Sequence, residues 1–267
     1  ELEIQSGSKN IMPDGTLLLT SVCDYIANQY NKIGEYDKAI EKLSLAIEIN
    51  PDDEQAYIHK FKFILTGGYI LADSGNAFGE DINNLLNKIK EISITNPYAA
   101  RELSRYYVDI ADYEKAEEAI NKAIFLDSTI MNFQFSKGVI FLNTSRHKEA
   151  LDLYTELHKK YPKDPNISTN LANSYYYIAG NFEDLDDFKN AIYNYKKALE
   201  IRITSFEQLK EEGKIPKDTY FSSTYLQLYN FYSSLYDLYL NIANNDAAFF
   251  DELGDDIVEE QKLYYQN

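Results

Sequence analysis

Apolar and polar positions alternate at helical spacing through most of the chain, in paired segments separated by short turns. The pattern is clearest between Thr20 and Asp53, where apolar residues spaced three and four apart predict helices over about 16–32 and 36–49. Gly34 is the expected turn between these helices. Asn50-Pro51 ends the second, because proline cannot continue a helix.

The same two-helix pattern recurs further along the chain. Ala116 and Ala150 lie 34 positions apart and occupy equivalent places in two consecutive units, 97–130 and 131–164. A third unit at 165–204 is longer, and the stretch GNFEDLDDF places its additional residues at the turn. A repeated two-helix unit predicts a stack in which neighbouring units bury a continuous core.

Residues 54–96 form a looser unit, with expected helices over about 54–72 and 81–94 joined by a glycine-containing loop. After the last unit, Ser205 to Lys214 is expected to be a helix end and linker. A long aromatic helix is expected over about 216–243 and a shorter helix over Asp246 to Tyr265.

The first unit has small or apolar residues at the positions that two packed helices share. These residues are Ala27, Tyr30, Gly34, Ala39, Leu43, Ala46 and Pro51. This arrangement resembles the tetratricopeptide repeat (TPR) family, in which units of about 34 residues stack. The resemblance implies an all-α fold: a right-handed α-solenoid of helix-turn-helix repeats with C-terminal capping helices.

The predicted organisation has three parts. Residues 1–13 form a flexible tail, with Asp14 as the N-cap of the first helix; residues 14–204 form the repeats; and residues 205–267 form the capping helices. The predicted repeats are 20–53, 54–96 (degenerate), 97–130, 131–164 and 165–204.

The net charge of −17 disfavours nucleic acid and anionic lipid as partners, because both attract basic proteins. No apolar run approaches the roughly 18 residues that span a membrane. The single cysteine, Cys23, excludes an internal disulfide and fits a reducing compartment such as the cytoplasm. Because the chain begins at Glu1 without an initiating methionine, a processed or exported form stays open.

No motif for catalysis, metal or cofactor is found. The glycine-rich stretch TGGYILADSGNAFGED lacks the Gly-Lys-Ser/Thr ending of a phosphate loop. The acidic residues 183–187 lack the spacing of a calcium loop. The three histidines, His59, His147 and His158, have no partner at metal spacing. We therefore expect a chain that is not an enzyme and has no cofactor.

Arg101 and Arg105 are two of only four arginines and lie one helical turn apart. Like charges at this spacing repel, so the pair needs an explanation. One hypothesis is that both bind a carboxylate or an acidic peptide. The alternative is local pairing, of Arg105 with Asp109 or of Arg101 with an acid on the neighbouring repeat.

In TPR proteins the first helix of each repeat lines the concave groove, and the resemblance places several further side chains there. Asparagine can hydrogen-bond an extended peptide backbone from both sides. The predicted groove residues are Asn28, Asn31, Arg101, Arg105, Asn132, Asn143, Asn170, Asn173, Tyr176 and Tyr177. The alternative is that asparagine is simply common in this composition.

These observations favour a non-catalytic module that binds a protein or peptide partner. Alternatives are a signalling-peptide receptor, a secretion or assembly chaperone, and a scaffold part of a larger protein that self-associates through residues 216–243. TPR co-chaperones that hold the carboxyl end of heat-shock chaperones use a lysine and an asparagine one turn apart in the first helix. Here Asp24 stands where that lysine would be, one turn before Asn28, so that function is not assigned.

Overall fold

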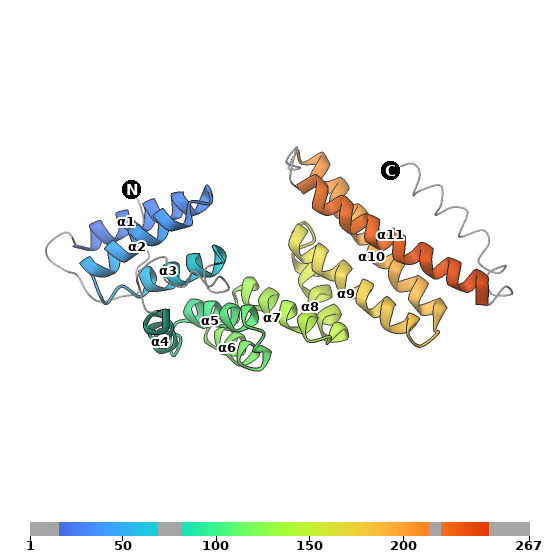
Figure 1. Ribbon diagram of the computed structural model, residues 1–267, viewed down its shortest axis with the longest axis horizontal. Helices are drawn as coiled ribbons and strands as arrows, with labels where there is room; N and C mark the ends of the chain where they lie inside the picture. Colours follow the sequence, from blue (N-terminus) through green and yellow to red (C-terminus); the bar gives the residue numbers. More distant parts are fainter. Residues whose placement is uncertain (1–15, 69–81, 214–219, 246–267) are drawn as a thin grey trace. The chain divides into compact units, whose positions relative to one another are not determined.

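The computed structural model describes residues 16–68, 82–213 and 220–245. Four predicted features lie outside this range: the tail 1–13, the N-cap Asp14 of the first helix, most of the glycine-rich loop, and the helix expected after Asp246. The described residues form eleven helices and no strand (Figure 1). The helices are α1 (Thr16–Lys32), α2 (Tyr36–Ile49), α3 (Glu54–Thr66), α4 (Ile82–Ile92), α5 (Pro97–Asp109), α6 (Tyr113–Leu126), α7 (Met131–Asn143), α8 (His147–Lys160), α9 (Pro165–Glu183), α10 (Phe188–Glu211) and α11 (Tyr220–Asn245).

Local sequence signals set the helix ends. Asp53, Asn96 and Asp112 each accept a backbone N–H of the first turn of the following helix. Gly34 adopts a φ of +77° between α1 and α2, a backbone conformation that L side chains rarely adopt. The helix over 36–49 ends before Asn50-Pro51, as the sequence predicts.

The chain divides into two compact units, residues 1–133 and 134–267, which we call the N-terminal and C-terminal units. In the N-terminal unit, α1 packs on α2 and α5 on α6, and α3 contacts α1, α2 and α5. Small residues such as Ala39 and Ala46 on α2 are fully buried, which lets these helices approach closely. Cys23 is buried in this core.

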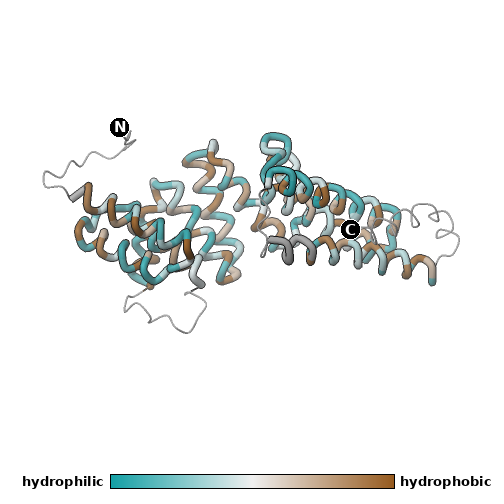
Figure 2. The backbone as a smooth tube through the Cα atoms, turned by 90° about the horizontal axis from the view of Figure 1, so that it is seen from above, coloured by the Kyte–Doolittle hydropathy of each residue, from teal (hydrophilic) through white to brown (hydrophobic). Residues whose placement is uncertain are grey.

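In the C-terminal unit, α10 packs along α9 and α11 packs on α10. Their shared core combines small residues, such as Ala172 and Ala198, with the large side chains Phe231, Leu235 and Leu238. Hydrophilic and hydrophobic positions alternate along the helices, as amphipathic packing requires (Figure 2).

Three predicted boundaries were wrong. The helix expected over 54–72 ends at Thr66, where Gly68 adopts a φ of +74°. The helix end and linker expected at 205–214 begin later than predicted, because α10 continues to Glu211 with Ser205 and Leu209 on its buried face.

The third correction concerns the stretch GNFEDLDDF. Its first half extends α9 to Glu183, and the turn occupies only 184–187. The extension is held by packing, because Phe182 contacts the core and the Tyr195 hydroxyl donates to Glu183 at 2.9 Å. The repeat boundaries assigned from the sequence stay a prediction.

Candidate functional site

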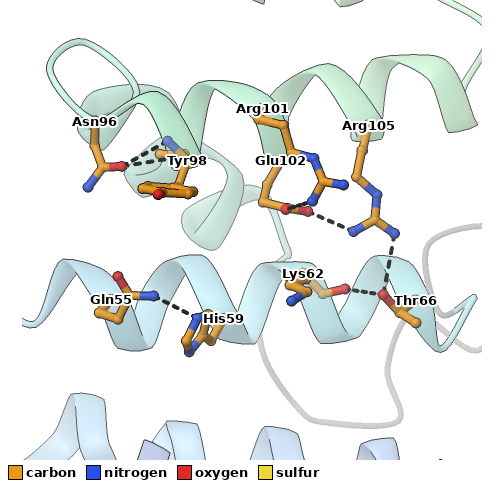
Figure 3. A network of polar contacts seen from close by, with 10 residues as sticks. Gln55, His59, Lys62, Thr66, Asn96, Tyr98, Arg101, Glu102 and Arg105 are labelled. Carbon is orange, nitrogen blue, oxygen red and sulfur yellow. Dashed lines mark hydrogen bonds and ion pairs between the residues drawn. The ribbon is translucent and has the colours of Figure 1, made fainter. Parts of the chain in front are cut away.

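Polar side chains from α3 and α5 form a network in the N-terminal unit, on first helices of the predicted repeats (Figure 3). Arg101 and Arg105 both pair with Glu102, which lies between them on α5. Arg105 Nη1 lies 2.8 Å from Glu102 Oε2, and its Nη2 donates to the Thr66 hydroxyl on α3 at 3.3 Å. The arginine pair therefore shares one carboxylate and connects two helices.

The carboxylate of Glu102 is nearly inaccessible, with a side-chain exposure of 4%. The arginine side chains are 27% and 30% exposed. Because a buried charge needs a partner, the arginines pair with Glu102 while part of each arginine side chain stays exposed. We call Arg101, Glu102 and Arg105 the arginine cluster.

Neither predicted local pairing is found in the described residues, where Arg105 makes no ion pair with Asp109 and Arg101 pairs with no acid of another repeat. Burial raises the pKa of the Asp109 carboxyl, and the nearby Arg105 opposes that shift. The local partner of both arginines is Glu102, which the sequence interpretation missed. Its signal was visible, since a glutamate three residues before an arginine is well placed for an ion pair on a helix.

A second part of the network links α1 to α3. The Asp24 carboxylate lies 2.5 Å from His59 Nδ1, and Gln55 Nε2 lies 2.6 Å from His59 Nε2. Asn28 donates to the Asp24 carboxylate at 3.1 Å. Asp24 accepts from His59 Nδ1–H, and His59 Nε2 accepts from the Gln55 amide, so both imidazole nitrogens are engaged.

The remaining predicted asparagines of the groove are on α1, α7 and α9. Asn31 is half-buried on α1, and Asn143 is exposed at the end of α7. Asn170 and Asn173 are half-buried on α9. Within the described residues, the side-chain amides of these four make no hydrogen bond, whereas Asn132 has a partner.

Tyr176 has a packing role in the C-terminal unit. Its ring stacks on Phe231 of α11 at 4.7 Å between centroids, and its hydroxyl lies 2.8 Å from the Ser234 hydroxyl. These contacts hold α9 against α11. The sequence placed Tyr176 on a ligand-facing surface, but its ring and its hydroxyl are both engaged in the fold.

Tyr177 is exposed and stacks on His147 at 4.9 Å between ring centroids. Burial lowers the pKa of the His147 imidazole below its usual 6.5. The folded state therefore favours neutral His147, and this stabilisation is complete above pH 6.5. We expect it to be lost as the pH falls from 6.5 toward the lower folded-state pKa.

An NMR titration of His147 is expected to show a midpoint below pH 6.5. Tyr177→Ala, which removes the stacked ring, is expected to move the midpoint back toward 6.5. A midpoint at or above 6.5 in the parent chain would contradict the burial argument.

The described residues contain neither a cluster of metal-binding side chains nor a membrane-spanning helix. The described residues hold no group of three or more His, Cys, Asp or Glu side chains that could bind a metal ion. Across the same ranges, no helix is both long and apolar enough to cross a membrane.

Comparison with solved structures identifies the fold. A thermophilic TPR protein from Thermus thermophilus matches 71% of this chain and 98% of its own, with a TM-score of 0.50 and 17% sequence identity. The chain has the tetratricopeptide-repeat fold. The all-α repeat architecture expected from the sequence is thus confirmed.

Curated relatives match parts of the chain. U-box domain-containing protein 70 of Oryza sativa subsp. japonica is 29% identical over 100 residues, covering 38% of this chain and 12% of the relative. Hsp70-Hsp90 organizing protein 2 of Arabidopsis thaliana is 23% identical over 171 residues, covering 63% of this chain and 29% of the relative. The chain thus spans less than a third of the length of either. No family model matches it.

Proposed function

We propose that this TPR chain is a non-catalytic interaction module that binds a partner peptide across the first helices of its N-terminal unit. In this proposal the arginine cluster holds a carboxylate of the peptide. The single observation that carries it is the charge of the cluster: two guanidinium groups share one carboxylate, which leaves one net positive charge at a partly exposed position.

This local positive charge is opposite in sign to the net charge of the chain, which is −17. Within the described residues Arg101 makes no polar contact except that with Glu102, and its buried Nε has no partner. A guanidinium presents several N–H groups in a fixed planar array. A ligand carboxylate can therefore accept from the N–H groups that Glu102 leaves free, through charge-assisted hydrogen bonds.

The Asp24–His59 pair supports a binding mode different from that of the co-chaperone clamp. Where such clamps carry a lysine, this chain has an acid already bonded to His59 and Asn28. An added carboxylate at that end of the surface would meet a like charge. The proposal therefore places the acidic group of the peptide at the arginine cluster, on α5, and a neutral or basic part near α1.

The test uses a variant that removes the charges without leaving Glu102 unpaired. Arg101→Gln, Glu102→Gln and Arg105→Gln together replace the three charged groups by neutral amides, which can still hydrogen-bond to one another. The probe is a fluorescein-labelled peptide ending in Glu-Asp, measured by fluorescence anisotropy. Because hydrogen bonds to charged groups contribute about 1.5–3 kcal/mol, we expect about 10- to 100-fold weaker binding.

The matched control is Lys38→Gln, Glu41→Gln and Lys42→Gln on α2, which removes two cations four residues apart and an acid between them. This control is expected to bind like the parent. Equal loss in both triple variants would indicate a nonspecific charge effect, and unchanged binding in the arginine-cluster variant would refute the proposal. Amidation of the peptide's carboxyl end separates a terminal carboxylate from the acidic side chains.

A further inference from the structure

The structure divides the aromatic helix α11 into two faces. Phe231, Leu235, Leu238, Tyr239 and Ile242 are buried in the core of the C-terminal unit. On the other side, large apolar side chains remain exposed: Leu226 (60%), Tyr229 (56%), Tyr236 (50%) and Leu240 (45%). The sequence pattern predicts a long aromatic helix here but does not separate these two faces.

The exposed residues follow the spacing of a helix–helix seam. Leu226, Tyr229, Tyr236 and Leu240 lie at positions separated by three, seven and four residues, and half-exposed Ser233 occupies the place between the tyrosines. Apolar residues that alternate at three and four along a helix form a stripe that can pack against one other helix. We call these five positions the α11 stripe.

The charge of α11 restricts what can occupy the stripe. Asp237 is the only charged residue among the 26 residues of the helix, in a chain whose composition is 26% charged and whose net charge is −17. Two copies of such an acidic chain repel each other except where they meet through an uncharged surface. The α11 stripe is such a surface, and a second copy supplies an identical apolar one.

We propose that the α11 stripe is a self-association surface, on which α11 of a second copy docks in antiparallel orientation. Antiparallel pairing sets Tyr236 of one copy over the small Ser233 of the other, and Tyr229 against Leu240. Parallel pairing would instead place Ser233 on Ser233 and tyrosine on tyrosine, which packs less well than alternating large and small residues. Because a dimer of this kind has two-fold symmetry, each of these contacts occurs twice in the interface.

The available area predicts a weak dimer. A fully buried aromatic side chain contributes roughly 150–250 Å², so two half-exposed tyrosines and two half-exposed leucines from each copy provide at most about 800 Å². Flanking polar residues add to this, but specific stable interfaces bury about 1,200–2,000 Å². We therefore expect a dissociation constant of roughly 10–100 μM.

Sedimentation equilibrium of the full chain, at concentrations from about 5 to 500 μM, is expected to show a monomer–dimer equilibrium in this range. Tyr229→Glu with Tyr236→Glu is expected to abolish the dimer, with the helical circular dichroism signal unchanged. The matched control is Tyr193→Glu on α10, whose side chain is also 56% exposed, and which should dimerise like the parent.

A charge-pair variant tests the orientation. Tyr229→Glu alone should weaken the dimer. Adding Leu240→Lys should lower the dissociation constant of the dimer at least about tenfold relative to Tyr229→Glu alone, because each glutamate then faces a lysine of the other copy. A double variant no tighter than Tyr229→Glu overturns the antiparallel pairing. A parent chain that stays monomeric throughout overturns the self-association itself, including the case in which residues 246–267 cover the stripe within one copy.

Discussion

Tyr154→Ala is expected to lower the free energy of unfolding by about 3–5 kcal/mol, the range for removing a large aromatic side chain from a core. Tyr154 is fully buried on α8. Its hydroxyl donates to the Phe135 carbonyl at 3.0 Å, and its ring meets the Phe135 ring edge-on. The substitution leaves a cavity and removes the hydrogen bond from the Tyr154 hydroxyl to the Phe135 carbonyl. Urea denaturation followed by circular dichroism measures the loss.

The buried Tyr154 ring also determines the effect of Gly138→Ala. In most helix interiors this change stabilises by about 0.8–1.0 kcal/mol. Here a Cβ on Gly138 would lie 2.5 Å from Tyr154 Cζ, far inside van der Waals contact. Since Tyr154 has no room to move, we expect a net destabilisation of about 1–3 kcal/mol instead.

Two controls isolate the contact between these residues. Gly180→Ala on α9 should stabilise, because a Cβ there would meet only the Tyr195 hydroxyl at 3.9 Å. In the Tyr154→Ala background, Gly138→Ala should become neutral or stabilising, because the cavity accepts the methyl group. An equal cost of Gly138→Ala in both backgrounds would show that Tyr154 is not the cause.

Arg101→Ala with Arg105→Ala is expected to have the second large effect, about 3 kcal/mol of destabilisation. The double variant leaves the buried Glu102 carboxylate without the ion pairs that it makes in the folded state. Removing one side of a buried pair costs about 3–5 kcal/mol, and the partial exposure of the arginines places this case at the low end. Thermal and urea unfolding both report the change.

Adding Glu102→Gln to this double variant should recover most of the loss, because the buried charge is then gone. Lys38→Ala with Lys42→Ala on α2 is the control. Those lysines pair with Glu35 and Glu41 in exposed positions, where ion pairs contribute about 0–1 kcal/mol. If the Glu102→Gln triple variant is no more stable than the double variant, the arginines stabilise by packing and not by charge. Charge reversal of both arginines would therefore test folding and binding at once, which is why the binding test neutralises all three groups.

The sequence by itself determined the repeat and most helix ends. Gly34 and Asn50-Pro51 act through local backbone geometry, which depends on few neighbours. The 34-residue spacing of Ala116 and Ala150 shows the repeat directly in the sequence. Such signals can be identified without knowing what lies across the helix. The all-α repeat architecture follows from them.

Only the tertiary structure decided which polar side chains meet. Asp24 and His59 are 35 positions apart, and their contact depends on how closely α1 and α3 pack. The burial of Glu102 and the packing of Tyr176 on Phe231 likewise depend on neighbouring helices. A helical sequence pattern determines on which side of its own helix each residue lies. Whether that side meets solvent or another helix is set by packing, which divided the aromatic surface of α11 into a buried and an exposed face.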